Sequence, residues 1–500
     1  MRGAYLVADV RSAEAEAMAR VPDGALMARA AFGLAVTCGK WLAGRGLRVR
    51  DADVVVLAGS GNNGGDALFA AAQLAGRGAA VTVVALSPAV HGGGVAAVRA
   101  AGGRMLTAAD DLDAALAATS AADLVLDGIV GIGGSGPLRP TAAALAEAGR
   151  GRIIAVDLPS GIDPDTGAVA DPDACVHAEV TVTFGALKAG LCVAPGREYA
   201  GLVHLIDIGL AALGEVPPAL WVMNLATAGA HVPRPGPADD KYTRGVVGVV
   251  AGSTAYPGAG ILCTGAARFG GVGMVRYAGG APDVVVPRWP DVVPSHTGPA
   301  FAGRVQAWVV GPGAGTDAAA KERLAEAISV PVPLLIDADG ITLVADNADL
   351  RAAVVARTAP TLFTPHAGEF ARLGGELDTA GGRVAAVARL AAELDSVILL
   401  KGAATVVASA QGPAVVSASG PPDLATAGSG DVLSGLAGSM LAAHRGMPNA
   451  DAVRDIAAAA AYLHGTAGRL AAVDGRPIVS DDVLAAVPEA IAVSRTATPL

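Results

Sequence analysis

Two glycine-rich segments constrain this chain most, because each has the form of a loop that holds phosphate groups. Gly59–Asp66 reads Gly-Ser-Gly-Asn-Asn-Gly-Gly-Asp, and Ala425–Asp431 reads Ala-Thr-Ala-Gly-Ser-Gly-Asp. Glycines allow the backbone to turn its N–H groups toward an anion, and the N-terminus of a following helix adds positive partial charge. The sequence therefore predicts nucleotide handling in both halves of the chain.

The length of the chain predicts more than one domain. A chain of 500 residues exceeds the size at which a single hydrophobic core keeps growing. Apolar residues make up 52% of the sequence, aromatic residues only 3%, and 67 glycines interrupt the pattern, which is typical of tightly packed α/β layers. Several prolines and weak periodicity mark a connection near residues 211–240. We therefore place one domain at residues 1–215 and a second at 225–495.

Charge and cysteine usage indicate a protein that acts on metabolites in the cytoplasm. A net charge of −10 gives no basic footprint for nucleic acid, so we expect small-molecule substrates and no nucleic-acid partner. The 4 cysteines form no Cys-x-x-Cys pair and the 8 histidines no ligand-spaced cluster, which argues against a structural zinc ion. We also expect no export signal, no membrane association and, from the Ala-rich surface, a homo-oligomer.

The first half alternates strand-like runs with Ala-rich helical stretches. This alternation predicts an α/β fold with a doubly wound parallel sheet, in which ligands bind beyond the carboxyl ends of the strands. The strand-like runs are at residues 53–58, 80–86, 122–126, 152–157 and 179–184. Asn and Asp side chains in the loops that follow could be turn formers singly, but together they favour an oxygen-rich site for a hard cation and a hydroxylated substrate.

An ordinary NAD-dependent dehydrogenase is disfavoured. Gly59, Gly61 and Gly64 satisfy the Gly-x-Gly-x-x-Gly pattern of dinucleotide-binding folds. That pattern also needs an acidic residue after the second strand to hold a ribose hydroxyl, and here the strand runs into Ser87 and Pro88. The loop therefore serves another purpose.

Four motifs together resemble the NAD(P)H-hydrate epimerase family. They are Gly59–Asp66, Asp127–Gly134, Val156–Gly161 and Thr183–Gly190. The resemblance implies a Rossmann-like domain that uses K+ and interconverts the R and S forms of NAD(P)HX, the hydrated and damaged form of the reduced nicotinamide cofactor. Ala67 and the run Gly128–Val130 depart from the family pattern, and both departures spare the polar groups.

The resemblance assigns roles by position in these motifs. Asn63, Asp127 and Ser160 would hold K+, and Asp127 and Lys188 are the acid–base candidates, although Lys188 alone could be a solvated loop lysine. An alternative from another class is a binding module that has lost catalysis. The residues expected to contact NAD(P)HX are Asn62, Asn63, Gly64, Gly65, Asp66, Gly131, Ile132, Gly133, Gly134, Ser135, Gly136, Pro137 and Asp157.

The second half restarts the alternation of strands and helices, with strand-like runs at Val246–Ala251, 305–310, 332–336 and 397–401. Its glycine-rich segment precedes a helical pattern, so the amides of residues 428–431 would point at a transferring phosphate and Asp431 could accept a proton from an attacking hydroxyl. A lone Gly-x-Gly-Asp is more often a helix cap. Lys401 at a strand end and His366 after Thr364-Pro365 favour a site, although His366 could be a packed loop residue.

With further motifs, this half resembles the ADP-dependent NAD(P)H-hydrate dehydratase family, which has a ribokinase-like α/β fold. The further motifs are Lys241–Gly245, Ala251–Ser253, Gly258–Ala259, Gly311–Gly315 and Asp337–Asp339. The resemblance implies that ADP phosphorylates the hydroxyl of the S hydrate and that loss of phosphate regenerates NAD(P)H, leaving AMP. Mg2+ is implied as the counterion of the phosphates. The alternative is a small-molecule kinase, since ribokinase-like folds also serve kinases.

This second resemblance also assigns residues. Asp431 would act as the base, and Gly428, Ser429 and Gly430 would hold the transferring phosphate. The adenine nucleotide would be bound by Lys401, Gly402, Ala403, Ala404 and Thr405 with Gly430, and NAD(P)HX would be faced by Ala259, Gly313, His366 and Asp431. The two halves together imply metabolite repair in which the epimerase supplies the epimer that the dehydratase accepts.

Overall fold

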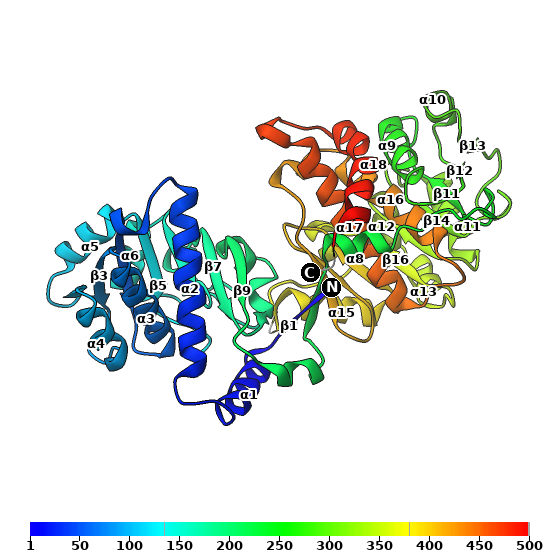
Figure 1. The fold of residues 1–500 in the computed structure, drawn as a ribbon. Helices are drawn as coiled ribbons and strands as arrows, with labels where there is room; N and C mark the ends of the chain where they lie inside the picture. Colours follow the sequence, from blue (N-terminus) through cyan, green and yellow to red (C-terminus); the bar gives the residue numbers. More distant parts are fainter. Residues whose placement is uncertain (135, 380, 499–500) are drawn as a thin grey trace. The chain divides into compact units, whose positions relative to one another are not determined.

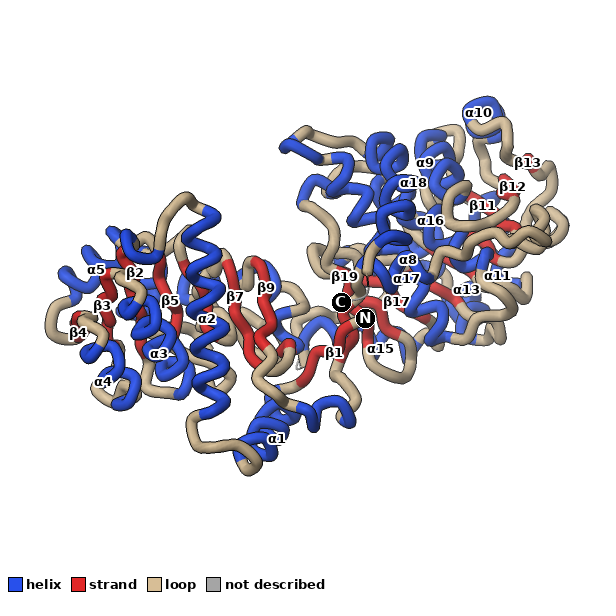
Figure 2. Tube along the Cα trace, viewed as in Figure 1, coloured by secondary structure: helices blue, strands red, loops and turns tan. Residues whose placement is uncertain are grey.

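The computed structural model describes residues 1–134, 136–379 and 381–498, and the chain divides into two compact units. One unit comprises Gly3–Ala219, and the other comprises Leu220–Leu500 together with Met1–Arg2. Figures 1 and 2 show that each unit packs helices against strands of its own. Among the described helices, none combines the length and the apolar composition that a membrane span needs.

The N-terminal unit contains a parallel sheet with the strand order β4-β3-β2-β5-β6-β7-β9. The chain reverses its direction of winding between β2 and β5, and ligands bind to such sheets at this reversal, beyond the carboxyl ends of the strands. The predicted doubly wound, Rossmann-like sheet is confirmed. The strands are β2 (Asp53–Ala58), β3 (Ala80–Ala85), β4 (Arg104–Thr107), β5 (Leu124–Gly128), β6 (Ile153–Val156), β7 (Val180–Phe184) and β9 (Leu202–Ile206).

Helices cover both faces of this sheet because its strands are apolar on both sides. Val54 and Val56 lie in the core that α2 and α3 cover, whereas Val55 and Leu57 lie in the core that α5 and α6 cover. Figure 1 shows α2 and α3 across the strands. The helices are α1 (Val7–Met18), α2 (Ala25–Gly44), α3 (Asn62–Gly76), α4 (Gly92–Ala100), α5 (Leu112–Ala121), α6 (Pro140–Ala148) and α7 (Gly196–Tyr199).

Two strands of this sheet, β4 and β9, have no counterpart among the predicted runs. Both lie at edges of the sheet, and their side chains are mostly half-buried or exposed. A strand in such a position lacks the continuous apolar run that identifies a buried parallel strand. The five runs that were predicted are all strands of the sheet.

The C-terminal unit contains a sheet that is parallel from β13 to β17 and antiparallel across β17, β18 and β19. The predicted runs match β11, β14, β15 and β17, and the prediction of an α/β fold for this half is confirmed. In spatial order the strands are β13 (Val293–Pro294), β12 (Met274–Tyr277), β11 (Val246–Val250), β14 (Ala307–Val310), β15 (Leu334–Ile336), β16 (Thr361–Phe363), β17 (Val397–Leu400), β18 (Thr405–Ala408), β19 (Ala414–Ser417) and β10 (Leu220–Val222).

The helix after the second glycine-rich segment, α16 (Ser429–Ala443), lies deep in this unit, with every residue from Val432 to Ala443 buried. Glycines permit this depth: a Cβ at Gly435 would come within 2.0 Å of the Cys263 carbonyl oxygen, and one at Gly438 within 1.9 Å of a Val309 methyl group. The N-terminus of α16 is therefore held in a fixed place. The other helices are α8 (Leu225–Ala230), α9 (Pro257–Ala267), α10 (Pro282–Arg288), α11 (Ala318–Ser329), α12 (Asp339–Asp346), α13 (Ala348–Val355), α14 (Ala367–Arg372), α15 (Gly382–Glu393), α17 (Ala450–Ala471) and α18 (Ser480–Thr496).

Candidate active sites

The first glycine-rich loop connects β2 to α3 at the reversal point of the N-terminal sheet. The Gly59 N–H donates to the Gly128 carbonyl oxygen at 3.0 Å, which ties this loop to the end of β5. Helix α3 begins at Asn62, and Gly61 occupies its N-cap position. No side chain caps this end of the helix. The first-turn N–H groups of α3 therefore face the region beyond the strands, as a phosphate or hydroxyl group requires.

Gly59→Ala should destabilise this unit, because a Cβ there would lie 1.9 Å from the Ile129 carbonyl oxygen, a backbone atom that cannot rotate away. We expect a loss of about 1–3 kcal/mol in the free energy of unfolding. Gly61→Ala is the matched control, since a Cβ at Gly61 meets nothing within 4 Å, and it should change stability by less than about 0.5 kcal/mol. Urea unfolding followed by circular dichroism measures both, and equal losses would contradict the assigned clash.

Asp127 and Ser160 form a buried pair beneath this loop. The Ser160 hydroxyl donates to Asp127 Oδ1 at 2.7 Å, and the backbone N–H groups of Ser160 and Ile129 donate to the carboxylate at 2.8 and 3.2 Å. Burial raises the pKa of Asp127 to about 6, against the lowering effect of these hydrogen bonds. Both residues are withdrawn from solvent, with exposed fractions of 0% and 1%.

The Asn63 side chain is adjacent to the same loop and lacks partners. Its amide nitrogen and oxygen are both buried without a hydrogen bond among the described residues. A Cβ at Gly131 would lie 3.0–3.1 Å from this amide, and one at Gly128 would lie 3.4 Å from the Asn63 carbonyl oxygen, so the strand end that carries Asp127 passes close by. A buried amide oxygen without a donor costs free energy unless a ligand or cation engages it.

Lys188 is buried, so the alternative of a solvated loop lysine is wrong. Its exposed fraction is 1%, and its ammonium group donates to Asp157 Oδ1 at 2.5 Å, to the Phe184 carbonyl at 2.9 Å and to Thr183 Oγ1 at 3.1 Å. These three acceptors use all three N–H groups of the ammonium. Asp157, held in the left-handed region at φ +66°, lines the cavity, whereas Lys188 lies behind it.

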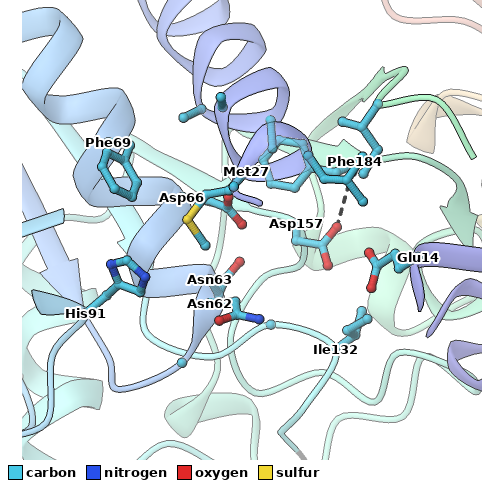
Figure 3. A pocket seen from close by; sticks show the side chains of 18 of the residues that line it. Glu14, Met27, Asn62, Asn63, Asp66, Phe69, His91, Ile132, Asp157 and Phe184 are labelled. Atoms are coloured by element: carbon cyan, nitrogen blue, oxygen red, sulfur yellow. Dashed lines mark hydrogen bonds between the residues drawn. The ribbon is translucent and has the colours of Figure 1, made fainter. Parts of the chain in front are cut away.

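A cavity of about 1130 Å³ opens beyond these strand ends. Figure 3 shows Asn62, Asn63, Asp66 and Asp157 around it. Among the predicted contacts, the lining contains Asn62, Asn63, Asp66, Gly131, Ile132, Gly133, Gly134 and Asp157. Gly64 and Gly65 are buried in α3, Gly136 and Pro137 are exposed outside the lining, and Ser135 falls outside the described residues.

Other residues of the lining carry no sequence signal of their own. Glu14 comes from α1, Met27 from α2, and His91 from the loop before α4. They lie outside the motifs in sequence, and the packing of α1, α2 and the loop before α4 brings them to the cavity. Burial first, and then the charges of Asp157 and Glu14, raise the pKa of Asp66 well above its ordinary value.

In the C-terminal unit, Asp431 lies in the first turn of α16, after Gly428 at φ +88°. Burial, and next the charge of Asp337, raise the pKa of Asp431 to about 7. A Cβ at Gly430 would lie 3.4 Å from Lys401 Nζ and 3.9 Å from Asp337 Oδ2. The structure therefore brings the glycine-rich turn, Lys401 and a buried carboxylate together.

Asp337 holds Lys401 and Ser434 in this site, although the motif Asp337–Asp339 alone assigned it no role. Its carboxylate is 1% exposed and accepts hydrogen bonds from Lys401 Nζ at 2.9 Å and Ser434 Oγ at 2.7 Å. Lys401 also lies 3.8 Å from Glu369 Oε2. Burial acts to lower the pKa of Lys401, and the carboxylates of Asp337 and Glu369 outweigh it, so the ammonium form is favoured.

His366 caps α14 rather than packing inside a loop, so the alternative of a packed histidine is wrong. Its side chain is 61% exposed, and Nδ1 accepts from the N–H groups of Gly368 and Glu369 at 3.0 and 3.3 Å. The Glu369 carboxylate accepts from the His366 N–H at 2.8 Å and completes a capping box. Because Nδ1 accepts, Nε2 of the neutral ring carries the proton.

The other predicted residues of this unit lie in loops and at the starts of α9, α16 and β18. A Cβ at Gly313 would meet the Ala259 Cβ at 2.6 Å, so this pair is in contact. Gly402 and Ala403 are exposed and Ala404 is buried in the turn before β18, which begins at Thr405. Ser429 is buried, and its hydroxyl lies 3.2 Å from His464 Nε2.

Comparison with known proteins decides the family. Residues 23–190 match the model of the YjeF-related protein N-terminus, and residues 247–488 match that of NAD(P)H-hydrate dehydratase. The bifunctional NAD(P)H-hydrate repair enzyme Nnr of Mycobacterium tuberculosis is 49% identical over 417 residues, covering 83% of each chain. The chain belongs to the family of bifunctional NAD(P)H-hydrate repair enzymes. Both sequence resemblances are thereby confirmed.

Further proteins are similar to the whole chain or to one half of it. The Nnr protein of Mycobacterium leprae is 47% identical over 482 residues, covering 95% of this chain and 96% of the relative. The NAD(P)H-hydrate epimerase of Clavibacter michiganensis is 47% identical over 226 residues, 43% of this chain and 93% of the relative. Among solved structures, a ribokinase-like superfamily protein from Enterococcus faecalis is similar with a TM-score of 0.49 and 24% identity, covering 55% of this chain and 96% of that chain.

Proposed function

We propose that the N-terminal unit of this chain interconverts the R and S forms of NAD(P)HX and that the C-terminal unit dehydrates the S form to NAD(P)H with ADP. The observation that carries this proposal is Asp431, a half-buried carboxyl in the first turn of α16 near Lys401, with its pKa raised to about 7. Such a group can accept a proton from a hydroxyl near neutral pH. Family membership supports both activities.

The N-terminal site fits a K+ ion at Asn63, Asp127 and Ser160. The Asn63 amide is buried without a partner, and the buried carboxylate and hydroxyl of the other two residues supply further oxygen atoms. Oxygen ligands of this kind suit a hard cation. When bound, K+ would add positive charge that attracts the oxygen atoms of the substrate.

Proton transfer to the hydrate belongs to side chains that line the cavity. Asp127 lies outside the lining and accepts hydrogen bonds from three donors, which suits a cation ligand. Lys188 is bonded to Asp157 and would act on the substrate through that residue. We therefore infer that both acid–base candidates of the sequence work from behind the cavity wall. Asn62, Asp66 and Asp157 are the polar groups of the motifs that would meet NAD(P)HX.

In the C-terminal site, Asp431 would take the proton of the substrate hydroxyl. At the same time the hydroxyl oxygen would form a bond to the β-phosphorus of ADP. The bond from that phosphorus to the bridging oxygen breaks, and AMP leaves with the electron pair. Lys401 and the N–H groups of residues 428–430 would stabilise the charge on the phosphate. The phosphate then leaves with the C–O bond electrons, and loss of a proton from the neighbouring ring carbon restores the double bond of NAD(P)H.

Mg2+ would accompany the phosphates of ADP in this site. The Asp337 carboxylate is already engaged by Lys401 and Ser434, and Asp339 Oδ2 accepts from the Gly315 N–H at 2.8 Å. These carboxylates can remain close to the ion without leaving their partners, so phosphate oxygens and water would supply most ligands, as Mg2+ commonly accepts. The ion would offset the phosphate charge.

The pH dependence of dehydration should report Asp431. Because the base acts in its ionised form and its pKa is about 7, kcat/KM for ADP-dependent dehydration should fall about tenfold per pH unit below pH 7. A carboxyl with an ordinary pKa of about 4 would leave the rate flat from pH 6 to 8. The same raised pKa means that Asp431 contributes stability fully below its ordinary pKa and loses it as the pH rises through about 7. A flat rate profile would contradict the assignment.

Product analysis separates this function from a small-molecule kinase. Incubation with S-NADHX, Mg2+ and either ADP or ATP, followed by chromatography, should give NADH, AMP and phosphate in equal amounts from ADP. A stable phosphorylated product that accumulates with ATP would favour the kinase instead. Conversion of R-NADHX to S-NADHX by the same protein, without nucleotide, tests the epimerase half and distinguishes it from a binding module.

A further inference from the structure

The helix α1 carries a carboxyl group that the motifs of the epimerase site do not include. Its buried face is formed by Val7, Val10 and Ala13, and Glu14 continues that stripe at helical spacing where an apolar side chain would be expected. Glu14 is half-buried and lines the substrate cavity. The match to the family model of this unit begins at residue 23, beyond this helix.

The start of α1 is fixed by contacts within the N-terminal unit. β1 (Arg2–Tyr5) pairs in parallel with β8 (Leu187–Lys188), which places Tyr5 opposite Lys188 just before the helix. The Val7 N–H donates to Asp165 Oδ1 at 2.7 Å, and Arg11 donates to the Ile132 carbonyl, in the cavity wall, at 3.0 Å. Glu14 is therefore presented to the cavity by an anchored element.

The surroundings of Glu14 supply charge but no fixed partner. No described residue forms a hydrogen bond or an ion pair with its carboxyl group, whereas Arg11 on the same helix is bonded to the cavity wall. Besides burial, the charges of Lys188, Asp157 and Arg11 shift the pKa of Glu14, and the charge of Glu14 in turn helps to raise the pKa of Asp66. Figure 3 shows Asp66 and Glu14 on opposite sides of Asp157.

Two carboxyl groups of this cavity, Glu14 and Asp66, favour the protonated form. The carboxyl groups of Glu14, Asp66 and Asp157 occupy one cavity, and the Lys188 ammonium is already bonded to Asp157. Burial, more than any nearby charge, raises the pKa of Glu14, and Asp66 is shifted in the same direction. Two carboxyl groups that line one cavity and carry one proton between them provide an acid and a base at the same pH.

We propose that Glu14 is a further catalytic residue of the epimerase site, which exchanges a proton with the substrate hydroxyl from the side opposite Asp66. This inference rests on the proposed epimerase function. Epimerisation moves the hydroxyl from one face of the ring to the other, so each face needs a group that can give and take a proton.

The step balances without another reactant. One carboxyl group protonates the hydroxyl, the C–O bond breaks as the ring nitrogen forms a C=N bond, and water departs. Water then adds to the opposite face, the C=N electrons return to nitrogen, and the second carboxylate takes the proton. A proton passed between the two carboxyl groups through water restores the starting state.

Glu14→Gln in the full-length protein tests the proposal. With R-NADHX in K+ buffer, and after subtraction of the rate without enzyme, chromatography of the two epimers should show kcat lowered by about 10²–10⁴-fold with little change in KM. Glu14→Asp should restore part of the activity and keep a pH-dependent rate. Glu16→Gln is the matched control, since Glu16 lies on the same helix, is 46% exposed and pairs with Arg20.

The outcomes separate this inference from the function on which it rests. Wild-type kcat in Glu14→Gln, or equal loss in Glu14→Asp together with a lowered melting temperature in both, would overturn the catalytic role. A wild-type protein that does not epimerise R-NADHX at all would overturn the epimerase function itself. ADP-dependent dehydration of S-NADHX, measured on every variant, should keep the wild-type rate. This rate verifies that the C-terminal unit remains intact.

Discussion

Asp431→Asn should abolish the recovery of NADH from S-NADHX, lowering kcat by about 10²–10⁴-fold. The amide keeps the size and one acceptor oxygen of the side chain but cannot take the proton of the attacking hydroxyl. Binding of ADP should survive, because Lys401 and the N–H groups at the start of α16 stay in place. A stopped-time assay of NADH absorbance with saturating ADP and Mg2+ measures the loss, and titration calorimetry with ADP measures the binding.

Two controls make this result specific. Asp349→Asn changes an exposed carboxyl in the first turn of α13 of the same unit and should leave dehydration unchanged. Conversion of R-NADHX to S-NADHX should remain at the wild-type rate in Asp431→Asn, because that site belongs to the other unit. Normal dehydration by Asp431→Asn would show that Asp431 is not the base and that another group around Lys401 takes the proton.

Lys188→Ala should abolish epimerisation and destabilise the N-terminal unit. The substitution removes the ammonium group that neutralises Asp157 and leaves that carboxylate buried, with an exposed side-chain fraction of 10%. Breaking a buried ion pair in this way costs about 3–5 kcal/mol. The protein should then repair S-NADHX normally and R-NADHX only as fast as it epimerises spontaneously.

Lys40→Ala provides the matched control, because Lys40 is an exposed lysine on α2 of the same unit. The Lys40→Ala variant should have the melting temperature of the wild type and should repair both epimers. Differential scanning calorimetry resolves the expected loss of stability, and the time course of R-NADHX repair resolves the loss of activity. Wild-type repair of R-NADHX by Lys188→Ala would contradict the role assigned to the Lys188–Asp157 pair.

The sequence allowed the strand ends of the site to be predicted, because apolar runs followed by polar residues are local patterns. Asp127 ends a buried strand at the reversal of the sheet, and Asp157 follows the neighbouring buried strand. Asp431 was predictable for a similar reason, since a glycine-rich turn and a helix start adjoin it.

Partners that depend on packing could not be predicted. Lys188 and Asp157 are 31 residues apart, and nothing local identifies Lys188 as a buried side chain. Asp337 lies 64 residues from Lys401, and only the parallel order of β15, β16 and β17 brings the two together. Glu14 lies on a helix without a motif, so its place in the cavity follows from the anchoring of α1 alone.

The most direct measurement of the repair function is the recovery of NADH absorbance from a mixture of R- and S-NADHX with K+ and Mg2+, comparing ADP, ATP and no nucleotide. We predict rapid and complete recovery that requires ADP, because the N-terminal unit supplies the S form as the C-terminal unit consumes it. Recovery that stops at the fraction of S-NADHX would contradict the epimerase function, and no recovery with any nucleotide would contradict the dehydratase function.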